Sequence, residues 1–349
     1  MIYNTIEFHN VAGLEECHGH SGLGLFRFPP WVRSTMDTQN GRYAASLSVG
    51  CELRFVTDSP KFYVHLSARD CDGTVIVFNG DVFHSLQKVE MGKITTLQIQ
   101  KSERLEAINS QMLAGSRFST NVWRIMIGRA YNPSGNFLAY FHGIDTFGYD
   151  LRPPTPEEKP GLRWLAYGSS ITHGSGASNH HLSYIQQTAL HAGLDGINKG
   201  MGGSCHIEPS MVDFLVDGVD WDLASFELGV NMRGAYTLEE FEQRVTYLLD
   251  RLETTKPNKP VVIITIFPNW QSTGYCSTPS AVSEIEDGYN QILRDLCGKK
   301  LRHNLNLVEG TDLLQTTHFL CDDLIHPSDF GHIEMGRNLA GFLRKQVLG

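Results

Sequence analysis

The chain has 349 residues, of which 41% are hydrophobic and 19% charged, and its formal net charge at pH 7 is −9. That length is long for one domain and is typical of two. The negative charge argues against a nucleic-acid partner, which would need a basic surface. The sequence contains no run of about 18 apolar residues, so we expect no membrane-spanning helix and no membrane partner.

The cysteines and the first residues bear on the compartment. The seven cysteines are odd in number and include no Cys-x-x-Cys pair, which favours reduced thiols over a disulfide framework or a zinc site. The start, Met1-Ile-Tyr-Asn-Thr-Ile-Glu-Phe8, has neither the basic nor the apolar region of a signal peptide. We therefore expect a cytoplasmic protein.

Residues 1–150 have the pattern of a β domain. Short alternating or β-branched runs recur there, and no convincing amphipathic helix separates them. The runs are Tyr43–Leu47, Glu52–Val56, Phe62–Leu66, Thr74–Phe78, Ile94–Ile99, Val122–Ile127 and Phe137–Phe141. Many short strands punctuated by turn residues predict a β-sandwich resembling a jelly roll. Residues 151–160 follow it, are rich in proline and charge, and predict a stiff, extended, solvated linker.

From residue 161 to residue 349, strands alternate with helices. Short apolar runs predict buried strands at Trp164–Tyr167, Gly196–Asn198, Leu223–Leu228, Val261–Phe267 and Leu305–Val308. Helical periodicity is clearest over Leu238–Leu252 and recurs after Ser280 and over residues 331–347. This alternation predicts a parallel sheet with helices on both faces, a three-layer α/β/α domain. Ligands of such domains bind outside the carboxyl ends of the strands.

Ser170 is the candidate nucleophile. It lies in Gly168-Ser-Ser-Ile-Thr172, directly after the expected strand Trp164–Tyr167. A helix that begins here would bring its free N–H groups and positive dipole end to a developing negative charge. The alternative is that Ser169 and Ser170 are ordinary turn and N-cap residues.

Gly203 and Asn231 are candidate oxyanion donors, together with the backbone N–H of Ser170. Gly203 ends Asn198-Lys-Gly-Met-Gly-Gly203, and Asn231 ends Gly229-Val-Asn231; each segment lies at the end of an expected strand. The glycine offers a backbone N–H that no side chain blocks, and the asparagine offers its amide. An oxyanion hole needs donors about 2.7–3.1 Å from the oxyanion. Taken singly, both residues also fit ordinary turns and loops.

Asp323 and His326 are the candidate acid and base. They are three residues apart, so they would be neighbours on a helical turn. Asp323 would then fix the tautomer of His326 and stabilise the imidazolium, and Pro327 would occupy the first turn of the next helix. The alternative is that Asp323 caps that helix and His326 is an exposed loop residue.

Together, the four segments resemble the sequence blocks of the SGNH, or GDSL-type, esterase and lipase family. Residues 168–172 match Gly-Asp-Ser-Ile/Leu-Thr except for Ser169, and residues 198–203 match Asn-x-Gly-x-x-Gly. Residues 229–231 match the start of Gly-x-Asn-Asp, and residues 323–327 match Asp-x-x-His-Pro.

The resemblance covers about Arg163 to Leu348 and implies a flavodoxin-like SGNH-hydrolase domain that needs no metal or organic cofactor. It implies a catalytic triad of Ser170, Asp323 and His326, and an oxyanion hole of Ser170, Gly203 and Asn231.

Two positions depart from the family pattern. Ser169 and Met232 stand where the blocks have aspartate. Neither position supplies the nucleophile, the base or an oxyanion donor, so the mechanism is retained. We expect the loss of two carboxylates to make the mouth of the site less negative and to alter the substrate range.

The resemblance implies a serine esterase that hydrolyses short-chain, acetyl-like esters of a carbohydrate or another small alcohol. A β-sandwich precedes the SGNH domain in certain carbohydrate esterases and in an acyltransferase, and here it would shape the cleft or hold the alcohol. Two alternatives stay open: an acyltransferase, in which an alcohol replaces water, and a non-catalytic carbohydrate-binding protein. The acyl group, the alcohol and the oligomeric state are not readable from the sequence.

Overall fold

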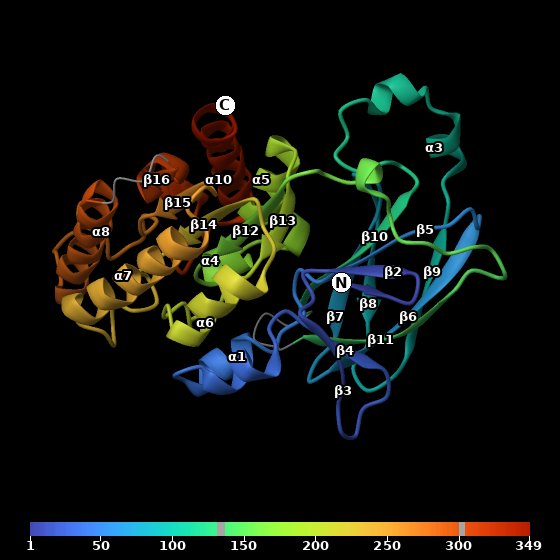
Figure 1. The fold of residues 1–349 in the computed structure, drawn as a ribbon, viewed down its shortest axis with the longest axis horizontal. Helices are drawn as coiled ribbons and strands as arrows, with labels where there is room; N and C mark the ends of the chain where they lie inside the picture. The colour runs from blue at the N-terminus through green and yellow to red at the C-terminus, as the bar shows by residue number, and fades with distance from the viewer. Residues whose placement is uncertain (131–136, 300–303) are drawn as a thin grey trace. The chain divides into compact units, whose positions relative to one another are not determined.

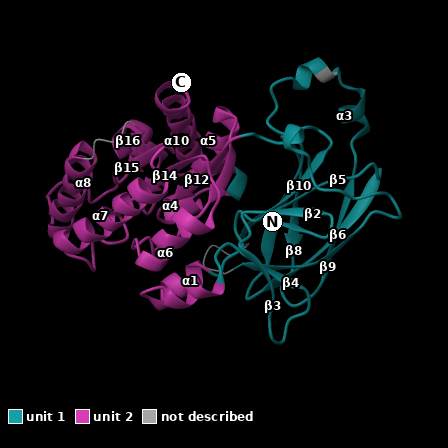
Figure 2. Cartoon of the chain, in the orientation of Figure 1, with its two compact units in different colours: residues 1–29, 46–161, 179–181 teal, residues 30–45, 162–178, 182–349 magenta. Residues whose placement is uncertain are grey.

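The computed structural model describes residues 1–130, 137–299 and 304–349. The chain forms two compact units (Figure 2). Unit 1 comprises residues 1–29, 46–161 and 179–181, and unit 2 comprises residues 30–45, 162–178 and 182–349. The backbone therefore passes between the units five times, after residues 29, 45, 161, 178 and 181. The sequence predicts one passage only, through residues 151–160.

Unit 1 contains two antiparallel sheets (Figure 1). The first has the order β1-β2-β5-β10-β7-β8, and the second has the order β3-β4-β11-β6-β9. The strands of the first sheet are β1 Ile2–Tyr3, β2 Ile6–His9, β5 Glu52–Val56, β7 Gly73–Asn79, β8 Val82–Val89 and β10 Val122–Ala130. Those of the second are β3 Gly13–Glu16, β4 Leu23–Phe26, β6 Lys61–Arg69, β9 Thr95–Gln100 and β11 Leu138–Asp145.

The two sheets share one apolar core, as a sandwich requires. Strand β6 alternates strictly between buried and half-buried residues, and its buried side chains, such as Val64 and Leu66, join this core. Phe55 from the first sheet packs edge to face on Phe62 from the second, with ring centroids 5.2 Å apart. The predicted β-sandwich is thus confirmed. Outside the sheets the unit contains α3 Glu103–Ala107 and the 3₁₀ turns η1 Ser110–Leu113 and η2 Pro156–Glu158.

One prediction in the first half of the chain is wrong. Residues 43–47, expected as a strand, overlap the helix α2 Gln39–Ala44, whose N-cap Thr38 accepts a hydrogen bond from the Gly41 N–H. Residues 151–160, expected as a solvated linker, are mostly exposed or half-buried and also contact unit 1. Arg152 exchanges two backbone hydrogen bonds with Val56, and the η2 turn that contains Glu158 interrupts the extended chain.

Unit 2 is built on a five-stranded parallel sheet with the order β13-β12-β14-β15-β16. Its strands are β12 Arg163–Tyr167, β13 Asp195–Asn198, β14 Leu223–Glu227, β15 Val261–Ile264 and β16 Leu305–Val308. Each overlaps one of the predicted strands. The buried apolar runs of β14 and β15 are typical of a parallel sheet covered on both faces.

Helices cover both faces of this sheet (Figure 1). The helices of unit 2 are α1 Pro30–Thr35, α2, α4 Ser170–His173, α5 Tyr184–Ala192, α6 Pro209–Asp213, α7 Leu238–Thr255, α8 Ala281–Lys299, α9 Gly310–Leu313 and α10 Asp329–Phe342. Shorter helical turns of this unit are η4 Phe214–Gly218, η5 Thr317–Phe319 and η6 Leu343–Val347, while η3 His180–Leu182 lies where the chain passes from unit 1 to unit 2. Helices α5 and α10 share a core with β12 and β15, and α7 packs on α8 through Phe241 and Tyr289, whose rings stack at 4.0 Å.

The three-layer α/β/α prediction for this part of the chain is therefore confirmed. The apolar stripe predicted over Leu238–Leu252 is the buried face of α7. Across the residues that the structure describes, no helix is both long enough and apolar enough to cross a bilayer.

Candidate active site

The first three sequence motifs lie at one edge of the parallel sheet. Strand β12 ends at Tyr167, β13 at Asn198 and β14 at Glu227, and each motif includes or follows one of these ends. Since β12 pairs in parallel with both β13 and β14, the three carboxyl ends lie next to one another. Their loops therefore meet outside the same edge.

The turn after β12 presents Ser170 at the start of α4. Ser169 is the N-cap, and its hydroxyl accepts from the Ile171 N–H at 3.2 Å. A side chain at Gly168 would clash, because a Cβ there would lie 2.3 Å from Thr172 Oγ1. The capping role thus belongs to Ser169, and Ser170 is left with its hydroxyl directed to a different partner.

That partner is His326. Ser170 Oγ lies 2.8 Å from His326 Nε2, and His326 Nδ1 lies 2.6 Å from Asp323 Oδ2. A carboxylate on Nδ1 favours the tautomer with the proton there, which leaves Nε2 to accept from the serine hydroxyl. The structure therefore brings together the three residues that the sequence proposes as nucleophile, base and acid.

Asp323 and His326 meet in a turn that is not helical. Asp323 Oδ1 accepts from the backbone N–H groups of Ile325 and His326, each at 2.9 Å, and Leu324 has φ 53. Burial alone would raise the pKa of Asp323, but these bonds and the bond from the His326 ring outweigh it and lower the pKa. The predicted helical turn is wrong, because the Asp323 side chain itself closes the turn. Pro327 also precedes α10, which begins at Asp329 with Ser328 as its N-cap.

Gly203 and Asn231 lie in the loops after β13 and β14. Gly203 has φ 65, a conformation that suits glycine, and its N–H donates to no atom of the part of the chain that the structure describes. Asn231 Oδ1 accepts from the Cys205 N–H at 3.1 Å, so the NH₂ end of this amide is the one that can face a ligand. This bond also joins the two loops to each other.

Glu227 is a site residue that the sequence reasoning missed. It ends β14 with 1% of its surface exposed, and its Oε2 accepts from the Ser169 N–H at 2.6 Å and from Thr172 Oγ1 at 3.1 Å. Burial raises the pKa of this carboxyl, against the bonds from Ser169 and Thr172 and the charge of His326. A carboxylate thus lies directly behind the turn that presents Ser170.

The two departures from the family pattern are buried and do not line the mouth of the site. Ser169 and Met232 both have 0% of their surface exposed. Neither side chain reaches solvent, and their effect on the charge of the site stays a prediction. The carboxyl of Glu227 lies beside Ser169 and accepts from its backbone N–H.

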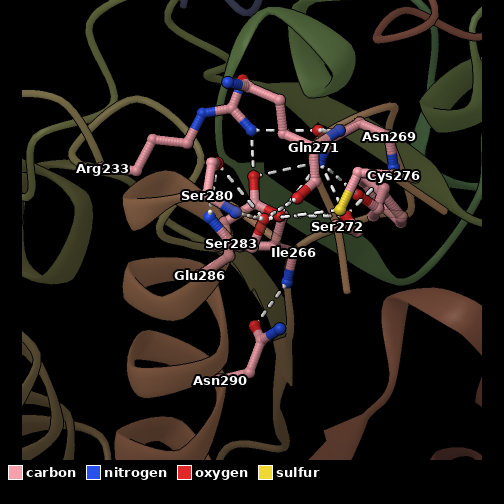
Figure 3. Close-up of polar contacts among 11 residues, drawn as sticks. Arg233, Ile266, Asn269, Gln271, Ser272, Cys276, Ser280, Ser283, Glu286 and Asn290 are labelled. Carbon is pink, nitrogen blue, oxygen red and sulfur yellow. Dashed lines mark hydrogen bonds and ion pairs between the residues drawn. The ribbon is translucent and has the colours of Figure 1, made fainter. Parts of the chain in front are cut away.

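A buried polar cluster supports the loops of the site (Figure 3). Glu286 of α8 accepts from Arg233, from Asn269 Nδ2 at 3.1 Å and from Ser272 Oγ at 2.9 Å. Arg233 follows Asn231 by two residues, so the cluster ties the loop after β14 to the loop after β15. The second loop reaches the Asp323 turn, because the Trp270 N–H donates to the Leu324 carbonyl at 3.0 Å.

The loop that follows Gly203 leads into a second buried carboxyl. Glu208, the N-cap of α6, has 1% of its surface exposed. Burial raises the pKa of Glu208 to about 7, although backbone N–H groups and Arg244 oppose the shift. His206 Nδ1 lies 3.8 Å from Glu208 Oε1, and burial lowers the pKa of His206.

Comparison with known proteins gives a family match over the same part of the chain. The model of the GDSL-like lipase/acylhydrolase family matches residues 163–344, more than half of the chain. A curated relative, an uncharacterized protein of Mycoplasma pneumoniae, is 21% identical over 212 residues. That match takes in 52% of this chain but only 24% of the relative, so this chain spans about a quarter of the relative's length.

Solved structures match nearly the whole chain. A salicylyl-acyltransferase from a tetracycline biosynthetic pathway has a TM-score of 0.73 at 16% identity, over 96% of this chain and 93% of its own. A family two carbohydrate esterase from Clostridium thermocellum, in complex with cellohexaose, has a TM-score of 0.58 at 14% identity, over 86% and 93%. An acetyl xylan esterase from the rumen bacterium Butyrivibrio proteoclasticus has a TM-score of 0.58 at 12% identity, over 99% and 97%. At these identities the likeness shows a shared fold.

Proposed function

We propose that this chain works through an acyl-enzyme on Ser170. The chain belongs to the GDSL-like lipase/acylhydrolase family and is a carboxylic ester hydrolase by class. The observation that carries the proposal is the continuous set of contacts from Ser170 Oγ through His326 to Asp323. Acyl transfer needs a nucleophile, a base in hydrogen-bond reach and a group that orients the base.

In the proposed acylation step, Ser170 Oγ attacks the ester carbonyl while His326 Nε2 takes the hydroxyl proton. The carbonyl π pair moves to oxygen, and the oxyanion is met by the N–H groups of Ser170 and Gly203 and by the Asn231 amide. Asp323 stays ionised and stabilises the imidazolium; its lowered pKa supports this role. When the carbonyl re-forms, the alcohol leaves with the proton from His326.

Deacylation reverses the roles with water as the nucleophile. His326 takes a proton from water, the hydroxide adds to the acyl carbon, and the carboxylic acid leaves as Ser170 recovers its proton. An alcohol in the place of water would give a new ester from the same acyl-enzyme. Hydrolase and acyltransferase therefore share every step up to the acceptor.

We infer that the substrate is an ester of a short, acetyl-like acid with a carbohydrate or another small alcohol. The fold shared with an acetyl xylan esterase and a family two carbohydrate esterase supports this class. The fold shared with a salicylyl-acyltransferase supports testing an alcohol acceptor as the second candidate. On this proposal the sandwich of unit 1 serves substrate selection, and a carbohydrate is a ligand but not a protein partner.

A series of nitrophenyl esters of increasing acyl length tests the nucleophile and the acyl group together. Ser170→Ala is expected to lower turnover by a factor of about 10⁴–10⁶ with the fold intact. Ser169→Ala is the matched control and should be far milder, because it removes a helix cap worth about 1 kcal/mol. An active Ser170→Ala enzyme would refute the proposal.

Product analysis separates the two acceptors. Acetylated xylo-oligosaccharide is incubated with the enzyme, with and without a free sugar alcohol in excess. Release of acetate alone indicates hydrolysis, whereas a new acetylated sugar indicates transfer. Neither product, from an enzyme that cleaves the nitrophenyl acetate, would remove the carbohydrate ester from the proposal.

A further inference from the structure

Asn40 lies far from the sequence motifs but contacts the loop that contains Gly203. Its Nδ2 donates to the Gly202 carbonyl at 3.1 Å and to Ser204 Oγ at 2.7 Å. The two contacts are with the residues on either side of Gly203, so the Asn40 amide bridges the glycine. All four residues belong to unit 2, because residues 30–45 are part of it.

The bond to the Gly202 carbonyl fixes the direction of the Gly203 N–H. The carbonyl of residue 202 and the N–H of residue 203 belong to one peptide plane, and in a trans peptide they point in opposite directions. Holding the oxygen on one side therefore aims the hydrogen to the other side. A hydrogen bond to the carbonyl also polarises the same amide and makes its N–H a stronger donor.

This peptide needs an external constraint because of its sequence. Gly202 and Gly203 have no side chains to restrict their backbone torsions, and Gly203 is already in the left-handed region with φ 65. Rotation of the whole peptide plane between two such glycines meets little steric resistance. A rotated plane would turn the carbonyl, a hydrogen-bond acceptor, toward the oxyanion.

The segment that contains Asn40 is firmly anchored. Asp37 Oδ2 accepts from Arg244 Nη2 at 2.7 Å, Thr35 Oγ1 donates to Ser210 Oγ at 2.8 Å, and the ring of Trp31 packs edge to face on Phe214. These contacts come from α1 and from the turn between α1 and α2, and they hold this segment to α6, η4 and α7. Asn40 is therefore presented from a fixed base, as a positioning residue must be.

We propose that Asn40 is a positioning residue of the oxyanion hole, which acts by holding the Gly202–Gly203 peptide so that the Gly203 N–H faces the substrate. The inference rests on the proposed function, because it requires Gly203 to be an oxyanion donor. It adds a residue from the first 45 positions to a site whose other members all lie after residue 160.

The test uses the full-length chain and the nitrophenyl acetate assay. Asn40→Ala is expected to lower kcat by about 10- to 100-fold with little change in KM. This effect is smaller than the about 10²–10³-fold decrease caused by removing an oxyanion donor, because the Gly203 N–H remains but is misdirected part of the time. Asn40→Asp should be worse than Asn40→Ala, since it sets a carboxylate oxygen against the Gly202 carbonyl. Ser34→Ala is the control: it removes a bond within α1, from Ser34 Oγ to the Trp31 carbonyl, that anchors nothing to the Gly203 loop, and it should leave kcat unchanged.

The affinity for a transition-state mimic distinguishes a positioning role of Asn40 from a merely structural one. A phenylboronic acid forms a tetrahedral adduct with the serine hydroxyl and places an oxygen in the oxyanion hole. Its inhibition constant should rise in the Asn40 variants by the same factor by which kcat/KM falls, while their melting temperatures stay near that of Ser34→Ala. Wild-type kcat and boronate affinity in Asn40→Ala, or an Asn40→Asp enzyme as active as Asn40→Ala, would overturn the inference.

Failure of the proposed function has a different signature. If Ser170→Ala retains activity, or if the wild type cleaves none of the esters, the proposed function fails and the inference fails with it. If Ser170→Ala is inactive and the Asn40 variants behave as wild type, the function stands and only the role of Asn40 is refuted.

Discussion

Replacing Glu208 with glutamine should change the way in which the stability of unit 2 depends on pH. The Glu208 side chain is almost fully buried, and burial raises its pKa from 4.5 to about 7. A folded-state pKa above the unfolded value means that the folded protein holds a proton that the unfolded chain releases. The stability due to this proton is complete below pH 4.5 and is lost as the pH rises through 7.

The two pKa values give the size of the effect. Between pH 5 and pH 8, linkage predicts that wild type loses about 2.5 kcal/mol of unfolding free energy through Glu208 alone, at about 1.36 kcal/mol per pKa unit. In Glu208→Gln the side chain at position 208 is uncharged at both pH values, so this variant loses no unfolding free energy through that position. Its stability relative to wild type should therefore improve by about 2.5 kcal/mol over this range, whatever constant cost the buried amide adds.

Hydrogen exchange measured on peptides from β12 and β14 is the suitable assay, because it reports on unit 2 separately. Variant and wild type are compared at the same pH, so the intrinsic exchange rates and all other titrating groups cancel. Ser210→Ala, two residues further on and without an ionisable group, is the control and should differ from wild type equally at pH 5 and pH 8. A constant difference between Glu208→Gln and wild type would refute the reasoning, since it would mean that the buried carboxyl keeps its ordinary pKa.

Three further substitutions address the candidate site. Glu227→Gln should lower the unfolding free energy by about 1–3 kcal/mol and should also lower kcat, because it weakens charge-assisted bonds to the turn that presents the nucleophile. Thermal unfolding measures the first effect and ester kinetics the second, and an unchanged kcat would show that Glu227 has no positioning role. Asn231→Ala should lower kcat by about 10²–10³-fold at nearly constant KM, and a loss confined to KM would contradict its place in the oxyanion hole. Asp323→Asn should lower kcat by about 10⁴-fold, since the amide favours the wrong histidine tautomer; a loss under tenfold in steady-state kinetics would contradict the triad.

Local pattern was sufficient for the regular elements of the second half of the chain. The apolar spacing of Phe241, Val245 and Leu248 predicted a helix face that the structure buries, and the short apolar runs predicted all five strands of the parallel sheet. The same reasoning failed at residues 43–47, where an alternating run lies in and after α2. Contacts of α2 with residues more than 160 positions away, such as Asn40 with Gly202, are invisible to a local pattern.

Some residues of the candidate site could be predicted from local sequence motifs, and others could not. Ser170, Asp323 and His326 lie in short motifs that can be read in the sequence, and the structure brings them together. Glu227 lies in no motif, and its relation to the nucleophile turn follows from the pairing of β14 with β12, which only the fold reveals. The roles given to Gly203 and Asn231, and the substrate-shaping role of the sandwich, stay predictions.

Because each unit is built from segments that alternate along the chain, gene recombination and synthesis on the ribosome cannot treat the two units separately. A gene fragment that begins at residue 161 encodes the whole parallel sheet but omits α1 and α2, so no single recombination point exchanges one unit and leaves the other complete. On the ribosome, Asn40 emerges 162 residues before Gly202, and its segment must wait for a binding surface that does not yet exist. Each unit has a core of its own, but neither is encoded by one continuous stretch of the chain.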